Sequence, residues 1–438
     1  MNAVPSATVR GTDLTGKIPA HWNRLRLGAL LDERKEIVGD RADSTKLLSL
    51  TLRGVIPRDM DNRVGKIPAS FETYQIVKPG DIVFCLFDVD ETPRTVGLAS
   101  EPGMVTGAYT VMKPRPGVDP RFLSYHYLSF DQSKSLRFLY AGLRNTIRSS
   151  DFKNIHFSVP PYLEQQQIAD YLDHETAEID ALLAGLESMK DLVVERNEAE
   201  RDACIWSQDQ PLIPLRRLIK YVDQGSSPQV MSSPAGPGEV GILKSGCTNF
   251  GIFNLEANKA VPTEMEIPEQ SFVHEGDLVI SRASGSTKHV GSSAVVPSLD
   301  RSLALSDKHY RLHVHDDVDV HYLAAVLRSR PFRNELEPYI SGAPGLAKNI
   351  SISSLKTMHV PHLSAEHQRE ISRRLQKSFE NVQEITRSID HAIDLARERR
   401  AALITAAVTG QIDVTAKNKP AAEQLEDDIA QGLHREHA

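Results

Sequence analysis

Three short stretches of this 438-residue chain have the residue types and spacing of known chemical sites. Gly11-x-x-x-x-Gly16-Lys17 has the glycine spacing of a phosphate-binding loop, in which backbone amides surround the phosphates and a Ser or Thr holds magnesium. Here Ile18-Pro19 follows in place of a hydroxyl, and no strand precedes the glycines. We therefore interpret this spacing as coincidental.

The other two stretches also lack groups that their chemistry needs. Val159-Pro160-Pro161-Tyr162 is similar to the Asn/Asp-Pro-Pro-Tyr element of amino-methyltransferases, but Val159 cannot accept a hydrogen bond from a target amine. Its prolines are predicted to form a stiff helix entry. His313-x-His315 would put two imidazoles on one strand face without an evident third ligand. The sequence predicts no metal site and no catalytic residue.

Composition and charge narrow the protein class. The three cysteines stand far apart, which gives no sign of a disulfide framework, and no apolar run is long enough for a membrane span or a signal peptide, so we expect a cytoplasmic protein. Residues 1–163 hold 22 Lys and Arg against 17 Asp and Glu, whereas residues 164–200 hold 2 against 11. The acidic segment is too negative to lie along DNA and is predicted to face protein or solvent.

The chain repeats itself once, at an offset of 203 residues from Gly142 onward that drifts to 196 and 194 further upstream, as loops of unequal length require. Gly142-Leu143 corresponds to Gly345-Leu346, and Glu195-Arg196 to Glu398-Arg399. Before each long polar stretch, short β-type runs bounded by Gly, Pro and Asp alternate with amphipathic pieces. This pattern favours two mixed domains of similar frame.

Each repeat ends in a pattern typical of a long helix. Apolar residues recur at steps of three and four, with Glu175 and Ser378 at the one skipped position of each copy. A pattern sustained over about four heptads favours two helices, each on the order of 50 Å long, that pair as a coiled coil. Two helices that each cover their own domain are the alternative. The predicted seam is Ile168, Leu172, Ile179, Leu182, Leu186, Met189, Val193, Ile371, Leu375, Val382, Ile385 and Ile389.

The predicted fold class is α+β, with two mixed α/β domains in a pseudo-twofold arrangement, separated by two long helices that form an antiparallel coiled coil. The expected order is a first domain at 1–163, a first helix at 164–200, a second domain at 201–365, a second helix with a return segment at 366–414, and a polar, disordered tail at 415–438.

The order of several motifs resembles the specificity (S) subunits of type I restriction-modification systems. The resemblance covers nearly the whole chain apart from the tail, with one departure: the second helix opens with Glu366-His367-Gln368 and lacks a Glu-Gln pair. The motifs are Ile18-Pro19-x-His21-Trp22, the turns Gly80-Asp81 and Gly276-Asp277, Pro160-x-x-x-Glu164-Gln165-x-x-Ile168, and Glu398-Arg399-Arg400-x-x-Leu403-Ile404-x-x-x-Val408-x-Gly410-x-Ile412-Asp413.

The resemblance implies a non-catalytic DNA-recognition subunit of a methylation and restriction complex. Each domain would be a target-recognition domain that reads one half of a bipartite double-stranded DNA target. The helices would set the spacer between the half-sites and dock two methyltransferase (modification) subunits. S-adenosylmethionine, ATP and Mg are implied for partner subunits and none for this chain; whether restriction/translocase subunits take part stays open.

Base recognition needs side chains that protrude from loops, while Lys and Arg fix the DNA backbone. In each repeat, the loop after the Gly-Asp strand and the loop at the Gly-Leu match are predicted to supply them. Solvated surface charge is the competing interpretation for any one residue. The predicted DNA-binding residues are Arg94, Thr95, Arg144, Asn145, Arg148, Ser284, Ser286, Thr287, Lys288, His289, Lys348 and Asn349.

Two other functions remain open from the sequence. The chain could be a diverged, self-contained DNA methyltransferase, which would bind S-adenosylmethionine by itself. It could instead be a coiled-coil scaffold that joins two proteins without binding DNA, which the large globular regions with dissimilar loops make less favoured.

Overall fold

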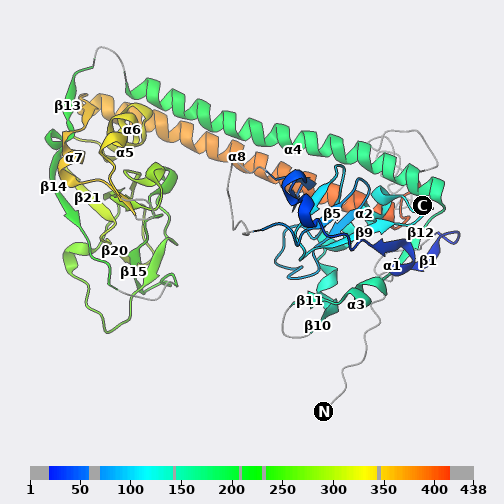
Figure 1. Ribbon diagram of the computed structural model, residues 1–438. Helices are drawn as coiled ribbons and strands as arrows, with labels where there is room; N and C mark the ends of the chain where they lie inside the picture. The colour runs from blue at the N-terminus through cyan, green and yellow to red at the C-terminus, as the bar shows by residue number, and fades with distance from the viewer. Residues whose placement is uncertain are drawn as a thin grey trace. The chain divides into compact units, whose positions relative to one another are not determined.

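The computed structural model describes residues 19–58, 70–141, 145–206, 210–228, 233–342 and 347–414. The chain divides into two compact units: unit 1 is Met1–Leu186 with His391–Ala438, and unit 2 is Glu187–Asp390 (Figure 1). Arg144 and the predicted polar tail at 415–438 lie outside the described residues.

Unit 1 is built around a four-stranded antiparallel sheet. Its strand order is β2 (Leu31–Glu33), β9 (Thr110–Pro114), β6 (Ile82–Phe84) and β7 (Val96–Leu98). Smaller antiparallel pairs surround it: β1 (Asn23–Arg26) with β12 (His156–Val159), β3 (Leu48–Thr51) with β4 (Gly54–Pro57), β5 (Gln75–Val77) with β8 (Gly103–Val105), and β10 (Tyr140–Ala141) with β11 (Thr146–Ile147). The helices are α1 (Leu27–Leu30), η1 (Gly39–Ser44), α2 (Pro120–Gln132), η2 (Ser135–Leu139), α3 (Ser149–Lys153) and α4 (Tyr162–Ile205), which continues into unit 2.

Unit 2 repeats this frame. Its four-stranded sheet has the order β14 (Ile219–Gln224), β21 (His309–Val314), β17 (Leu278–Ser281) and β19 (Ser293–Val295). A three-stranded sheet joins β16 (Asn258–Ala260), β15 (Val240–Leu243) and β20 (Ser302–Ala304), and two pairs join β13 (Leu212–Pro214) with β23 (His359–Pro361) and β18 (Ala283–Ser284) with β22 (Lys348–Asn349). The helices are η3 (Leu215–Arg217), η4 (Asn249–Gly251), η5 (Glu269–Ser271), η6 (Thr287–His289), α5 (Val320–Arg328), α6 (Arg330–Leu336), η7 (Glu337–Tyr339), α7 (Ile352–Thr357) and α8 (Ala365–Val408), which continues into unit 1.

A tight turn positions the central strand of each sheet. Gly80 and Gly276 have φ values of 86° and 88°, which residues with a side chain rarely adopt. The side chain of the Asp that follows each glycine accepts a hydrogen bond from the backbone three residues earlier. Asp81 accepts hydrogen bonds from the Lys78 backbone at 2.8 Å and from the Arg34 guanidinium at 2.7 and 2.9 Å. The Gly-Asp motif therefore forms the turn before the central strand, and its aspartate pairs with an arginine.

In unit 2 the arginine that pairs with this aspartate comes from a different strand. Asp277 accepts from the His274 backbone at 2.8 Å and from Arg311 at 3.0 Å. Arg311 lies on β21, whereas Arg34 follows β2. The repeat thus conserves the buried ion pair and not the position of the arginine.

The long helices are held to their units by a matched glutamine. The Gln165 side chain accepts from the backbone N–H of Asp119, which caps α2, and Gln368 accepts from Asp319, which caps α5, both at 2.9 Å. The missing Glu-Gln pair in the second copy is therefore a change at the position of Glu164 alone. The glutamine that contacts the domain is retained.

Helices α4 and α8 are antiparallel, and in each unit they lie side by side (Figure 1). In unit 1, Arg400 donates to Asp180 at 2.8 and 3.1 Å; in unit 2, Lys190 donates to Asp390 at 2.6 Å. Within unit 2, Lys190 pairs with Asp390 and Asn197 with Ser378, so residue numbers rise on α4 as they fall on α8, which defines the antiparallel direction. The predicted fold class of mixed α/β units with two long antiparallel helices is confirmed.

The burial of α4 places the seam partly on other residues than those predicted. Ile168, Leu172 and Ile179 are buried, but Leu182 and Met189 are each 54% exposed. The partly buried positions that follow Ile179 are Leu183, Leu186, Lys190, Val193 and Asn197, which continue an unbroken alternation of four- and three-residue steps.

Helix α8 shows the same difference. Ile389 is buried and Leu375 and Val382 are partly buried, but Ile385 is 46% exposed, and the neighbouring Thr386 takes the inward position. Ile371 packs against the core of unit 2. The apolar pattern assigned Met189 and Ile385 to the seam because the inward residues beside them, Lys190 and Thr386, are polar, and it chose Leu182 over the adjacent Leu183, which is equally apolar.

Candidate DNA interface

In unit 1, the two loops predicted from the repeat lie next to each other. Phe87, after strand β6, forms a β-bridge with Thr146 in β11. The backbone N–H of Asp88 donates to the carbonyl of Asn145 at 2.8 Å, and that of Ile147 donates to Leu86 at 2.7 Å. The segment after the Gly-Asp strand therefore continues the β10–β11 hairpin.

In unit 2, the equivalent segments pair in the same way. Ser284 of β18 stands opposite Lys348 of β22, and Ala283 stands opposite Asn349. The backbone N–H of Ile350 donates to the carbonyl of Arg282 at 3.0 Å. In both units, the loop after the central strand thus pairs with the second predicted loop at the same point of the frame. This pairing brings together predicted residues that are far apart in sequence.

Several predicted residues are exposed on these paired loops. Asn145 and Arg148 are exposed in unit 1, and Thr287 and Lys288 are exposed in unit 2. Within the part of the chain that the structure describes, Arg148 and Lys288 have no carboxylate within ion-pair distance. Ser286, His289, Lys348 and Asn349 are half-buried, and the Lys348 ammonium donates to the carbonyl of Gly342 at 2.6 Å.

Three predicted residues are placed where they support the loops instead. Thr95 is 1% exposed, and its hydroxyl donates to Asp131 at 2.8 Å, so its side chain offers no group to DNA. Ser284 is also buried. The Arg94 guanidinium lies 3.9 Å from Asp131, and burial lowers its pKa while Asp131 opposes that shift.

One charged side chain in each unit holds the loop after the central strand in place, and neither was predicted from the sequence. In unit 1, Asp131 at the end of α2 accepts from Thr95 and from Lys134 at 2.8 Å. In unit 2, Arg333 of α6 donates to the carbonyls of Thr287 at 3.1 Å and Lys288 at 3.3 Å. Burial lowers the pKa of Arg333. No local signal marks either residue, because each acts on a loop about 40 residues earlier in the chain.

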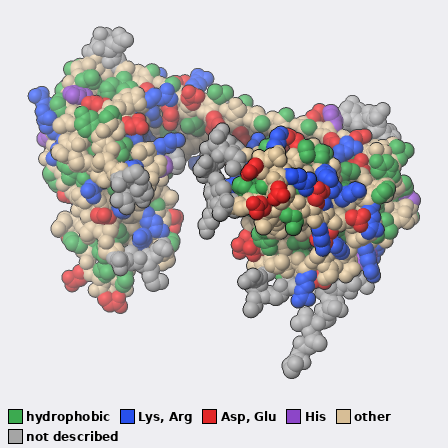
Figure 2. Space-filling view, in the orientation of Figure 1, with side chains coloured by type: hydrophobic (Ala, Val, Ile, Leu, Met, Phe, Trp, Pro, Cys, Tyr) green, Lys and Arg blue, Asp and Glu red, His purple; other side chains and the backbone are tan. Residues whose placement is uncertain are grey.

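Each unit also exposes one aromatic side chain just before its second loop. Phe138 in η2 is 69% exposed and Tyr339 in η7 is 51% exposed. The Arg137 guanidinium lies 5.2 Å from the centre of the Phe138 ring. Figure 2 shows Lys and Arg side chains gathered on the visible face of unit 1 with Asp and Glu beside them. Local donors and aromatics, more than a uniform positive field, therefore distinguish these loops.

The motifs that carried the family resemblance meet in space in unit 1. The Trp22 indole donates to Glu164 at 2.9 Å, and the His21 imidazole lies 2.8 Å from the same carboxylate. Gly410, with φ 71°, packs so closely on Pro19 that a Cβ there would lie 2.5 Å from the proline ring. Three motifs from the start, middle and end of the chain thus form one contact.

Residues 95–187 match the family described as type I restriction modification DNA specificity domain. These residues are similar to a type I specificity domain. The match runs from β7 through the paired loop with Asn145 and Arg148 into the first half of α4. It confirms the resemblance that the motif order indicated.

Two curated relatives from Escherichia coli extend the likeness. The chain is 30% identical over 142 residues to the type I restriction enzyme EcoEI specificity subunit, which covers 32% of this chain and 24% of that one. It is 21% identical over 317 residues to the EcoKI specificity subunit of strain K12, covering 69% and 68%. The chain therefore spans about a quarter of the first relative's length and about two thirds of the second's.

A solved structure supports the fold over a longer range. A chain from a study of the assembly and conformational transition of the type I R-M system superposes with a TM-score of 0.67 at 15% identity. The superposition covers 91% of this chain and all of the other. This likeness concerns the fold.

Other chemistry finds little support among the described residues. His174, Glu175 and Glu178 have ligand atoms within 4.8 Å of one another, but His174 and Glu178 are exposed and lie 3.4 Å apart as an ion pair. Such exposed groups are common without a metal. No helix within the described ranges is long and apolar enough to cross a membrane.

Proposed function

We propose that this chain is the DNA-recognition subunit of a type I restriction-modification complex. Each unit contacts one half of a bipartite duplex target through its paired loops. The observation that carries the proposal is the repeated loop pairing, which joins Phe87 to Thr146 in unit 1 and Ser284 to Lys348 in unit 2. Loops that share a frame and differ in side chains suit two different half-sequences.

Within each surface, residue types suggest a division of work. Asn145 can donate to and accept from a base edge, while Arg148 and Lys288 supply charge to phosphates. The exposed rings of Phe138 and Tyr339 would pack on sugars or enter a groove, as apolar wedges do. The buried Asp131 and the half-buried Arg333 hold these loops in shape and do not touch DNA.

The chain itself is proposed to be non-catalytic and to act in the cytoplasm with methyltransferase subunits. Those partners would supply the S-adenosylmethionine site, and a restriction subunit, where present, the ATP and Mg chemistry. Leu182, Met189 and Leu192 are each more than half exposed on one side of α4, next to acidic residues. An exposed apolar stripe of this kind suits a protein partner better than it suits DNA.

DNA binding by the full chain with its modification partner tests the proposal. Arg148→Ala should weaken binding to all sequences and reduce the salt dependence by about one phosphate contact, whereas Asn145→Ala should cost about 1 to 3 kcal/mol at one half-site only. Arg196→Ala removes the same charge from an exposed position on α4 and serves as the control. If the three variants bind and methylate alike, the loops are not the DNA surface.

A self-contained methyltransferase is the second function that the same samples test. The purified chain alone should not bind radiolabelled S-adenosylmethionine, while the complex with its modification partner should. Saturable binding by the chain alone would overturn the non-catalytic assignment.

A further inference from the structure

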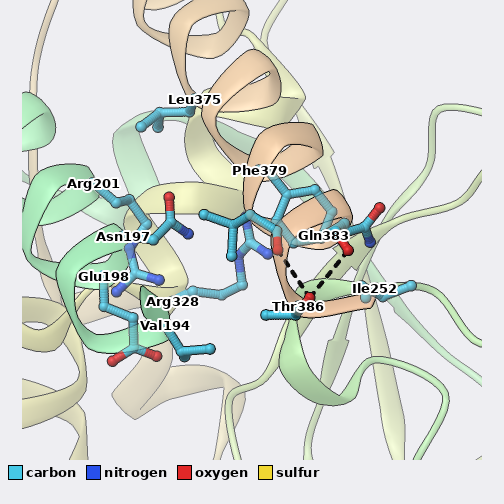
Figure 3. Close-up of a pocket in the computed structure, with 11 residues that line it drawn as sticks. Val194, Asn197, Glu198, Arg201, Ile252, Arg328, Leu375, Phe379, Gln383 and Thr386 are labelled. Atoms are coloured by element: carbon cyan, nitrogen blue, oxygen red, sulfur yellow. Dashed lines mark hydrogen bonds between the residues drawn. The ribbon is translucent and has the colours of Figure 1, made fainter. Parts of the chain in front are cut away.

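Unit 2 contains a cavity of about 300 Å³ that the DNA-binding proposal does not use. It lies between α4, α8, the turn after η4 and the end of α5 (Figure 3). Val194, Phe379 and Ile252 contribute apolar walls, and Arg201 and Arg328 bring guanidinium groups to it. Its volume is at the small end of the range for ligand pockets.

Arg328 is the notable group of this cavity. Its Nε donates to the Ala324 carbonyl at 3.2 Å, and among the described residues of unit 2 its Nη1 and Nη2 form no hydrogen bond. Burial lowers the pKa of Arg328 to about 10, and the like charge of Arg201 adds to the shift. Arg201 is already neutralised by Asp202 at 2.9 Å. No carboxylate among the described residues of unit 2 lies within ion-pair distance of Arg328.

The neighbouring backbone is shaped around this guanidinium. Gly251 has φ 74°, and a Cβ at that position would lie 1.5 Å from Nη1 of Arg328. Only a residue without a side chain leaves that space. The position of the arginine is therefore part of the local fold.

Unit 1 shows how a similar charge is balanced. Arg94 is also half-buried, but its guanidinium lies 3.9 Å from Asp131, and Asp180 adds to the compensation. In unit 2 the acidic residue that lines the cavity is Glu198. Among the described residues, Glu198 forms no ion pair with Arg201 or Arg328. A half-buried guanidinium without a close carboxylate has lost part of its hydration, so a negative group from outside would be favoured there.

We propose that this cavity binds a carboxylate carried on a small apolar group. Nη1 and Nη2 of Arg328 donate to the two carboxylate oxygens, the geometry in which arginine binds carboxylates best. Phe379, Val194 and Ile252 cover the apolar part. A carboxylate is favoured over a phosphate dianion because Glu198, which lines the same cavity, would repel a second negative charge.

Titration of the full chain with sodium 4-methylbenzoate tests this site. The uncharged 4-methylbenzamide and inorganic phosphate are the matched probes, and ligand-observed NMR gives the affinity. We expect saturable binding of 4-methylbenzoate that weakens at least tenfold in Arg328→Met, with at least tenfold weaker binding of the amide and of phosphate. Equal affinity of wild type and Arg328→Met, or of acid and amide, would overturn the proposal.

Two further measurements keep a negative result interpretable. Arg328→Met removes the uncompensated charge and should raise the melting temperature in the absence of ligand, so a loss of binding cannot be assigned to unfolding. Gly251→Ala displaces the guanidinium and should weaken 4-methylbenzoate binding as well. Wild-type affinity in Gly251→Ala would contradict the assigned geometry.

The carboxylate could belong to a free molecule or to an acidic side chain beside apolar residues in a protein partner. If it belongs to the modification partner, that protein should compete with 4-methylbenzoate and bind Arg328→Met more weakly. If it is a free ligand, both should bind together. DNA affinity should be unchanged in Arg328→Met, because this residue is not among the loop residues proposed to contact DNA, so the two proposals fail separately.

Discussion

His126 should make unit 1 lose stability in mild acid. Burial lowers the pKa of its imidazole to about 4, and Nδ1 has no hydrogen-bond partner within the described residues. The rings of Phe122, Phe130 and Phe157 surround it, with centroids at 5.9, 5.5 and 4.5 Å. An imidazolium in this environment would be cut off from water and would lack an acceptor at Nδ1.

The sign and size of the effect follow from proton linkage. The unfolded imidazole has a pKa of about 6.5, so between pH 6.5 and 4 the unfolded chain binds a proton that folded unit 1 excludes. The free energy of unfolding is therefore unaffected by His126 above pH 6.5 and falls as the pH drops toward 4. With these two pKa values, the loss between pH 8 and pH 5 is about 2 kcal/mol.

His126→Phe removes the titrating group and keeps an aromatic ring among the three phenylalanines. The chain has two tryptophans, and Trp22 packs in the same core as His126, so a Trp206→Phe background leaves one fluorescent reporter in unit 1. Urea unfolding at pH 8 and pH 5 should show a loss of stability that is about 2 kcal/mol smaller in His126→Phe than in the parent chain. His174→Phe, at an exposed position of α4, is the control.

The two histidine variants together decide the matter. If His126→Phe loses as much stability between the two pH values as the parent does, the buried imidazole is not the acid-sensitive group. The reasoning would also fail if His174→Phe removed the same amount, because that side chain is in solvent.

Three other predictions address the helices and the loop. The observed seam predicts that Leu183→Ala lowers the free energy of unfolding by about 1 to 2 kcal/mol, while Leu182→Ala changes it by less than about 0.5 kcal/mol; equal costs in urea unfolding would restore the original seam. Asp131→Asn should cost about 3 kcal/mol in unit 1, monitored by Trp22 fluorescence, because it leaves buried Thr95 and Lys134 without their carboxylate; a cost below about 1 kcal/mol would contradict the pinning role. Removal of seven residues from both α4 and α8 shortens each by about 10 Å, or about three base pairs, so methylation mapping should show a shorter spacer between unchanged half-sequences; an unchanged spacer would show that helix length does not set it.

The repeat and the two long helices could be predicted because they depend on patterns within the chain. The offset stays at 203 residues from Gly142 onward and drifts upstream where loops differ in length, and a helix shows its period locally. The α4 seam was assigned wrongly at Leu182, where the adjacent Leu183 lies inward, and at Met189, where the adjacent Lys190 does. Lys190 and Asn197 lie inward because Asp390 and Ser378 on α8 receive or supply their hydrogen bonds, at 2.6 and 2.9 Å. An apolar count passes over such polar residues and selected the exposed Met189 in place of Lys190.

The loop contacts could be predicted only in part. The matched positions pointed to the correct segments, since loops at equivalent points of a repeated frame have equivalent surroundings. The burial of Thr95 could not be predicted, because it depends on Asp131, which lies 36 residues later on another element. The same is true of Arg333, whose contacts with Thr287 and Lys288 span more than 40 residues. Long-range hydrogen bonds of this kind leave no periodic signal.

Asp131 and Arg333, which hold the loops after the central strands, explain how the two units can share one frame and carry different loops. In unit 1 a carboxylate, Asp131, accepts from the backbone N–H and the hydroxyl of Thr95. In unit 2 a guanidinium, Arg333, donates to loop carbonyls. An acceptor fits a loop that turns its N–H groups inward, and a donor fits one that turns its carbonyls inward, so each loop shape depends on the charge of the helix that follows. A loop moved without the helix that follows it would face a group of the wrong polarity. Under the proposed function, a change of target sequence therefore needs the loop to be exchanged together with the charged residue that holds it, Asp131 or Arg333.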